Sequence, residues 1–95
     1  MYLSFQQVGA DNSVKTAAAL TVPTRATQAE LQCTGAEPVR YTMDGSNPTA
    51  SSGMIMRITD PPKPFLIEDV KRIRFIRGGG ADTTLGLHYF AGRDI

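Results

Sequence analysis

The residues of this chain that could do covalent chemistry are few and far apart in the sequence. Cys33 is the only thiol and His88 the only imidazole among 95 residues. A nucleophile–base pair of the two is not excluded by the sequence, but neither lies in a nucleophile elbow or a comparable motif. A zinc site normally needs four donors, mostly Cys and His at short spacings. We therefore expect no enzyme activity, no metal and no cofactor, with Cys33 buried and His88 packed or solvated.

Two loops carry residue types that bind ligands in other proteins. The Gly78-Gly79-Gly80 run is glycine-rich like a phosphate loop, but no Lys-Ser/Thr pair follows it, and a flexible hairpin tip is expected. Asp44, Ser46 and Asn47 supply oxygens that could hold calcium, yet their spacing does not match an EF-hand loop. We predict instead that these side chains cap the backbone of their own loop.

The cations are concentrated near one predicted strand. Lys71, Arg72, Arg74 and Arg77 place four of the ten Lys and Arg residues within a short stretch. On a strand, Arg72 and Arg74 share one face about 7 Å apart. Such a face either meets an acidic partner surface, or less readily phosphate, or is a solvated face that discourages edge-to-edge aggregation. The sequence leaves these alternatives open.

Length and composition indicate one globular domain spanning residues 1–95. The chain is 41% hydrophobic and 20% charged, which is ordinary for a folded domain. A net charge of +1 argues against a domain dedicated to nucleic acid. No apolar run is long enough for a membrane-spanning helix, and residues 1–7 lack the charged start of a secretory signal. Because of this charge and the missing apolar run, neither a nucleic acid nor a membrane is an expected partner. The lone cysteine suits synthesis in a reducing cytoplasm.

The hydrophobic pattern predicts short strands at roughly ten-residue spacing. Residues 29–34 alternate, with Ala29, Leu31 and Cys33 inward, and residues 72–77 alternate with Ile73 and Phe75 inward and Arg72 and Arg74 outward. Residues 83–90 face the core through Leu85, Leu87 and Tyr89. The remaining strands are expected at residues 2–8, 14–22, 39–43, 54–58 and 65–67. Residues 14–22 are ambiguous, because Ala17-Ala18-Ala19 favours helix while the neighbouring Thr and Val favour strand.

Turn residues connect these strands and predict how they pair. Residues 35–38 would return the 29–34 strand into 39–43 as an antiparallel hairpin, and residues 78–82 would join 72–77 to 83–90 in a second hairpin. Residues 60–64 hold three prolines and form a stiff connector that cannot pair in a sheet interior. Residues 68–71 are expected to form one helical turn. The fold class is therefore all-β, an antiparallel β-sandwich or barrel of seven to eight short strands with at most one helical turn.

The chain is organised around residues 39–58, a strand, a structured loop and a second strand. Asp44-Gly45 is a strong turn signal, with Gly45 expected at positive φ, and Pro48 prevents a simple two-residue hairpin. The structural loop is predicted from Tyr41, Asp44, Gly45, Ser46, Pro48 and Thr49. These residues resemble the Y-T-x-D-G-S-x-P-T-x-S-S pattern of chitobiase-type C-terminal β-sandwich modules. That pattern describes a loop shape and implies no catalytic residues.

A longer and looser pattern resembles small virion structural proteins of tailed bacteriophages. It is made of Leu20-Thr-Val-Pro23, residues 29–33, Val39-Arg-Tyr41, the Asp-Gly-x-x-Pro-Thr loop, Gly53-Met54 and the late Ile-Arg-Phe-Ile. The resemblance implies a non-enzymatic virion component, most specifically a capsid decoration or cement protein, with a head–tail or tail component as an alternative. A carbohydrate-binding accessory module is a second alternative, although this chain has no Trp and Tyr41 and Tyr89 fall on predicted core faces.

The expected partners are phage capsid or other virion proteins, reached by assembly into a homo-oligomer for which a trimer is one closed symmetry. Residues 1–13 are either part of the domain or an N-terminal arm whose strand adds to a neighbour, because the Gln6-Gln7 end has no obvious partner within the chain. The predicted contact residues come from three segments: Tyr2 and Phe5, Pro61 and Pro62, and Arg72, Arg74 and Arg77.

Overall fold

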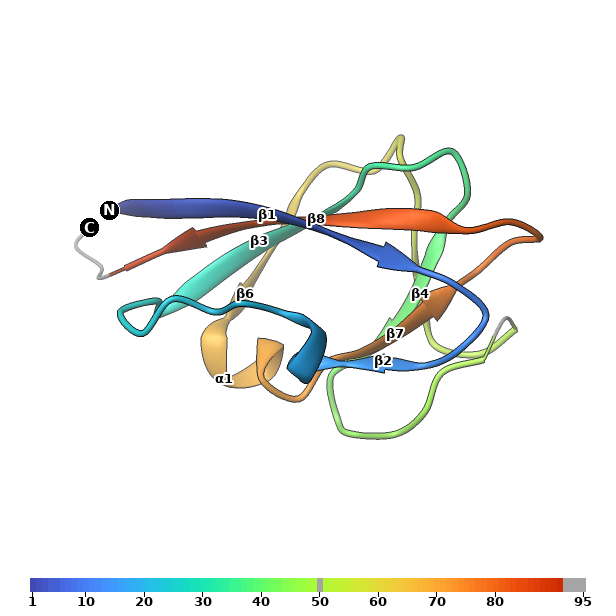
Figure 1. The fold of residues 1–95 in the computed structure, drawn as a ribbon, viewed down its shortest axis with the longest axis horizontal. Coiled ribbons are helices and arrows are strands. Elements are labelled where there is room, and N and C mark those ends of the chain that lie inside the picture. The colour runs from blue at the N-terminus through green and yellow to red at the C-terminus, as the bar shows by residue number, and fades with distance from the viewer. Residues whose placement is uncertain (50, 92–95) are drawn as a thin grey trace.

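Two four-stranded antiparallel sheets form the computed structural model, which describes residues 1–49 and 51–91. Ala50 of the loop pattern and the last four residues of the predicted domain lie outside this range. Sheet A has the strand order β1-β8-β3-β6, and sheet B has the order β2-β7-β4-β5 (Figure 1). The predicted all-β fold, with two packed sheets and one helical turn, is confirmed.

The strands are short, apart from the two that lie side by side in Figure 1, β1 and β8. Sheet A contains β1 (Tyr2–Ala10), β8 (Thr83–Phe90), β3 (Gln28–Cys33) and β6 (Lys63–Leu66). Sheet B contains β2 (Lys15–Thr16), β7 (Arg74–Arg77), β4 (Val39–Thr42) and β5 (Met54–Met56). A 3₁₀ turn, η1 (Ala17–Ala19), follows β2, and the one α-helical turn, α1 (Ile67–Val70), follows β6.

The core lies between the inner faces of the two sheets. Leu31, Leu87 and Tyr89 enter it from sheet A, and Val39 and Phe75 enter it from sheet B; all five are fully buried. Ile73, Leu85 and Cys33 are buried with them, as the alternating pattern predicts. Val70 of α1 is also fully buried, so the helical turn closes one end of the core.

Both predicted hairpins between alternating strands are wrong. β3 pairs with β8 and β6 instead of β4, and β7 pairs with β4 and β2 instead of β8. Residues 35–38 and 78–82 therefore cross from one sheet to the other. The two crossings lie against each other, since Gly78 N donates to Pro38 O (2.8 Å) and Thr83 Oγ1 donates to Glu37 O (2.6 Å). A turn signal shows that the chain reverses but not which sheet the next strand joins.

The close contact between the crossings explains why Gly35 stands in the first of them. A Cβ built on Gly35 would lie 2.2 Å from Thr83 Oγ1 and 2.9 Å from Thr84 N. Any side chain would push the first crossing away from the start of β8. The predicted hairpin turn is thus a packed corner of the sandwich.

Three smaller expectations also need correction. Residues 14–22 are only briefly a strand, because Thr16 Oγ1 caps the turn of alanines by accepting from Ala18 N (3.3 Å). The predicted strand at 54–58 ends at Met56, since Arg57 and Asp60 form a turn through Asp60 N donating to Arg57 O (2.9 Å). The proline connector is shorter than predicted, because Pro64 lies within β6. That strand is at the edge of sheet A, where the missing proline N–H costs no ladder bond.

Candidate interaction surfaces

The first half of the β4–β5 loop uses its polar side chains to hold its own backbone. Asp44 Oδ1 accepts from Ser46 N (3.0 Å) and from Ser46 Oγ (2.6 Å), and Thr42 Oγ1 donates to Ser46 O (2.6 Å). The bonds from the Ser46 side chain and then its backbone hold the pKa of Asp44 below its usual value. Gly45 has φ of +85°, which confirms the predicted turn geometry. Asp44 therefore caps the backbone of its own loop, as predicted. The prediction is wrong for Ser46, whose hydroxyl bonds to the Asp44 side chain, and for Asn47, whose Oδ1 accepts from Arg74 of β7.

The second half of the loop is closed by packing. Thr49 and Ser52 form a small antiparallel bridge, with Thr49 N donating to Ser52 O (3.0 Å). Pro48 is fully buried. Gly53 has φ of +112°, and a Cβ there would lie 3.1 Å from Pro48 Cβ and 3.2 Å from Tyr41 O. The structure thus joins all six predicted loop residues into one element whose groups mostly contact each other.

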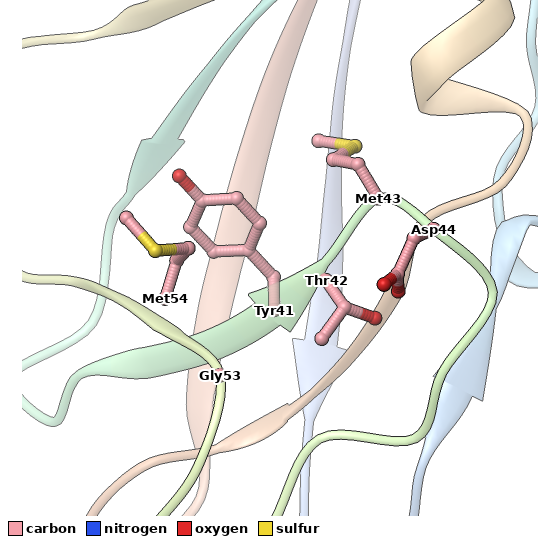
Figure 2. Close-up of a pocket in the computed structure, with 6 residues that line it drawn as sticks. All are labelled: Tyr41, Thr42, Met43, Asp44, Gly53 and Met54. Carbon is pink, nitrogen blue, oxygen red and sulfur yellow. The ribbon is translucent and has the colours of Figure 1, made fainter.

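An open hollow of about 600 Å³ lies beside this loop (Figure 2). Its lining comes from both ends of the loop: Tyr41, Thr42, Met43, Asp44, Gly53 and Met54. Figure 2 shows Met54 and the Tyr41 ring on one side and Thr42 and Asp44 on the other. Burial, and then the charge of Asp60, raises the pKa of Tyr41. Because Thr42 and Asp44 are already bonded to Ser46, the hollow offers mainly apolar contact.

The structure separates the two residues that could have formed a nucleophile–base pair. Cys33 faces the core and is 0% exposed, and its Sγ lies 3.2 Å from Glu37 O, to which it donates. His88 lies on the opposite, outer face of sheet A, where its Nδ1 is 3.2 Å from the hydroxyl of Tyr2. Within residues 1–49 and 51–91, no three His, Cys, Asp or Glu side chains gather as they would around a metal ion. None of the described helices is long and apolar enough to cross a membrane.

The three predicted arginine contacts do not share one strand face. Arg72 precedes β7 and pairs with Asp69 of α1 (3.0 Å), so the prediction that it lies on the strand is wrong. Arg74 Nη1 donates to Asn47 Oδ1 (2.5 Å) and so ties β7 to the β4–β5 loop. Arg77 lies at the end of β7, where its Nη1 is 2.8 Å from Asp82 Oδ1. Each guanidinium already has a partner within the chain, which reduces the charge available to another molecule.

The proline connector is exposed as expected. Pro61 and Pro62 lie between the turn at Asp60 and the start of β6, and both are solvent-exposed. They present a rigid shape, because proline restricts the backbone before any partner binds.

Four ring-bearing residues of β1 and β8 contact one another on the outer face of sheet A. We call these residues the aromatic cluster: Tyr2, Phe5, His88 and Phe90. The ring of Tyr2 contacts those of His88 (5.5 Å between centroids) and Phe90 (5.6 Å), and Phe5 contacts His88 (4.9 Å). Tyr2 and Phe5 remain about half exposed, at 51% and 49%. The cluster is suited to apolar contact with another molecule.

Glycine makes room for part of this cluster. A Cβ on Gly86 would lie 3.2 Å from Phe5 Cε1 and 3.0 Å from Thr34 Cγ2. Phe5 therefore lies over the backbone of β8. Tyr2 and Phe5 were predicted as contacts, but His88 and Phe90 were missed. The alternation that places Leu85, Leu87 and Tyr89 inward also places His88 and Phe90 outward.

β1 is an integral strand of the sandwich. It pairs with β8 from Tyr2 to Ala10, with one irregularity between Tyr2 and Ser4. The argument that the Gln6-Gln7 end has no partner within the chain is wrong, because Gln6 is opposite Leu87 and Gln7 is opposite Gly86 of β8. The Gln6 side chain is also bonded, since its Oε1 accepts from Tyr89 Oη (2.9 Å) and from Thr21 N (3.0 Å). The outer edge of β1, by contrast, pairs with no strand of the described chain.

The comparison with protein families covers most of sheet B and part of sheet A. The model of the Fn3-associated family matches residues 29–84, from β3 to the first residues of β8. The chain belongs to the Fn3-associated family. No curated protein and no solved structure matches the chain. The family segment includes the β4–β5 loop but excludes β1 and all four residues of the aromatic cluster.

Proposed function

We propose that this Fn3-associated chain is a non-enzymatic structural component of a tailed-phage virion that acts through protein–protein contacts. Its most specific form is a capsid decoration or cement protein, made in the host cytoplasm and located in the particle. The observation that carries the contact role is the aromatic cluster, in which Tyr2 and Phe5 are half exposed on the outer face of sheet A. Aromatic rings are enriched where proteins meet, because they bury a large area at little entropic cost.

The phage assignment is supported by the sequence resemblance over residues 20–90. A head–tail or tail component is an alternative within the same class. A domain of this size has limited surface, and a stable association needs about 800 Å² from each partner. If each molecule contacts several neighbours, as in a homo-oligomer on a shell, the required buried area is divided among several contacts.

A carbohydrate-binding module is the alternative from another class, and the aromatic cluster bears on it. Exposed rings are present, although Tyr41 and Tyr89 are buried as predicted. The ring planes of the cluster are tilted by 44° to 73° to one another, so they offer no common plane for stacking sugars. This geometry favours contact with a protein surface over stacking on sugar rings. A glycan array with the parent chain tests the alternative directly.

The proposal is tested by mixing the purified chain with particles that lack it and measuring co-sedimentation. We expect the parent to bind and the double variant Tyr2→Ser/Phe5→Ser to lose binding. The matched control is Met54→Ser/Ile58→Ser, which removes two equally exposed apolar residues, at 61% and 50%, away from the cluster. Absence of binding by the parent contradicts the virion role. Equal loss in both double variants contradicts the aromatic cluster as the contact.

The arginines and prolines are tested in the same assay as separate contacts. Arg72→Glu/Arg74→Glu reverses the charge beside the loop, and we expect weaker binding than for the parent if an acidic shell surface is the partner. Added salt should then weaken the binding of the parent but not that of the variant, because only the parent is held by opposite charges. Unchanged binding would show that the arginines are not part of the contact, and it would not contradict a contact through the aromatic cluster. Pro61→Ala/Pro62→Ala tests the connector in the same way.

A further inference from the structure

The outer edge of β1 exposes backbone groups in a regular pattern. Met1 and Ala91 exchange two hydrogen bonds, with Met1 N to Ala91 O at 2.8 Å and Ala91 N to Met1 O at 2.7 Å. On the other side of β8, Thr34 N donates to Thr84 O (3.0 Å). Successive residues of an antiparallel strand direct their N–H and C=O groups to alternate sides. The odd-numbered residues of β8 therefore bond to β1, and the even-numbered ones bond to β3.

This alternation identifies which residues of β1 face outward. Ser4, Gln6, Val8 and Ala10 are opposite the odd-numbered residues of β8 and bond to that strand. Phe5, Gln7 and Gly9 are opposite even-numbered residues, so their N–H and C=O groups point away from β8. No other strand in the described part of the chain pairs with them. The edge thus presents three evenly spaced residues able to donate and accept.

β1 also lacks the features that normally protect an edge strand. Its nine residues contain no charge and no proline, although one irregularity interrupts the pairing near Tyr2. The opposite edge of sheet A, β6, has four residues and includes Lys63 and Pro64. Charged residues and proline discourage pairing with another chain. β1 is therefore the edge of this sheet on which a further strand can be added.

We propose that the edge of β1 pairs with β1 of a second copy of the chain, antiparallel about a two-fold axis at Gln7. In this register Gln7 is opposite Gln7 of the second copy, and Phe5 is opposite Gly9 in both directions. All three outward-facing residues then form hydrogen-bonded pairs. If the axis passed through Phe5 or Gly9 instead, only the residue on the axis would be opposite another of these three residues. We name a second copy as the partner because the edge of β1 is complementary to itself in this register. A different protein would need a strand edge with the same pattern.

The side chains fit the same register. A Cβ built on Gly9 has no atom within 4 Å, so the space above Gly9 can accept the Phe5 ring of the second copy. An aromatic ring across an edge glycine is a favourable cross-strand arrangement. The two Gln7 amides can donate and accept with each other on the axis. Because β1 is uncharged, pairing brings no like charges together.

The pairing would join two copies of sheet A into one continuous sheet. A two-fold axis normal to the sheet keeps both outer faces on one side, so the two aromatic clusters lie on either side of the seam. This inference rests on the proposed assembly function and names a second copy as one partner. It predicts a dimer as the building unit, in place of the trimer considered from the sequence.

A cysteine test addresses the register. Gln7→Cys would place two thiols opposite each other in a hydrogen-bonded pair, where the Cα atoms lie about 5.5 Å apart and within disulfide range. The matched control is Gln28→Cys on β3, which is exposed on the same face but away from the edge. Under a mild oxidant we expect Gln7→Cys to form a covalent dimer and Gln28→Cys to remain monomeric. Equal rates of dimer formation overturn the pairing.

A second pair of variants tests the unmodified interface. We expect sedimentation velocity to show a concentration-dependent dimer for the parent and for Gln28→Lys. Gln7→Lys should lose the dimer because two lysines meet on the axis. A parent that stays monomeric at every concentration overturns the pairing, as does a dimer unaffected by Gln7→Lys. A parent that binds particles without dimerising contradicts only this inference, and one that dimerises without binding particles contradicts only the virion role.

Discussion

The β4–β5 loop and strand β1 differ in how fully their polar groups are used. In the loop, Asp44, Ser46 and Asn47 are bonded within the chain, and Pro48 is buried. β1 bonds to the sandwich along one edge only and exposes the rings of Tyr2 and Phe5. The loop has the strongest sequence pattern in the chain, whereas β1 has none. The recognisable pattern thus maintains the fold, and the contact role that we propose belongs to the less conspicuous strand β1.

The core beneath both regions should show the largest effect. Phe75 is fully buried and lies opposite Tyr41 of β4. Phe75→Ala should cost about 3–5 kcal/mol, because the cavity adds to the lost burial. Urea unfolding measures this, and particle binding should fall with the folded fraction. A soluble variant of near-parent stability would contradict the position assigned to Phe75.

Within the loop, the two glycines should differ. Gly45→Ala meets only the strain of a positive φ, about 1–2 kcal/mol, because nothing lies near its Cβ position. Gly53→Ala meets the same strain and also crowds Pro48 and Tyr41, which adds about 1–3 kcal/mol. The melting temperature of Gly53→Ala should therefore be clearly lower than that of Gly45→Ala. The reverse order would show that the loop relaxes around Gly53. Both folded variants should still bind particles if the loop is purely structural.

The bond between the core and β1 should show a pH dependence. Burial raises the pKa of Tyr89 to about 12 from 10.0, and its hydroxyl donates to Gln6. A raised pKa in the folded state stabilises the fold below pH 10, and this stabilisation is lost as the pH rises towards 12. Tyr89→Phe should cost about 1 kcal/mol at neutral pH. The free energy of unfolding of Tyr89→Phe should also fall less than that of the parent between pH 10 and 12. If the two fall equally over this range, the raised pKa of Tyr89 is contradicted.

On β1 itself, stability and binding should separate. Phe5→Ala removes a cross-strand contact with His88, for which about 0.2–1 kcal/mol is expected. Its melting temperature should stay close to that of the parent while dimerisation and particle binding weaken. A large loss of stability would mean that Phe5 belongs to the core, and the distinction between loop and strand would fail.

The smallest effect is expected at two similar turns, one at the end of β1 and one in the loop. Asp11 Oδ1 accepts from Ser13 N (3.0 Å), and this bond, followed by one from the Ser13 hydroxyl, lowers the pKa of Asp11 to about 2. Ser46 bonds to Asp44 in the same way, and its hydroxyl and then its backbone N–H lower the pKa of Asp44. A lowered pKa stabilises the fold above the ordinary value of 3.8, and this stabilisation disappears as the pH falls towards 2. Asp11→Asn/Asp44→Asn should flatten the acid limb of a stability–pH curve. If the loss of stability at low pH is the same in this variant as in the parent, it arises from other carboxylates.

The sequence by itself determined which residues are buried and where the chain turns. Alternation in residues 29–34 and 83–90 identified the inward faces, because a strand directs successive side chains to opposite sides. Positive φ at Gly45 and the helical turn near residues 67–70 also followed from local chemistry. These features depend on neighbours within a few positions, so a single sequence contains the information.

Only the tertiary structure decided which strands pair and which surface remains exposed. The chain crosses between sheets at residues 35–38 and 78–82 because Gly35 lets the two corners pack, a contact between segments distant in sequence. The same pairing brings Tyr2 and Phe5 beside His88 and Phe90, from opposite ends of the chain. A local pattern records that a residue points outward but not what lies next to it. The aromatic cluster and the unpaired edge of β1 therefore exist only once β1 and β8 have paired.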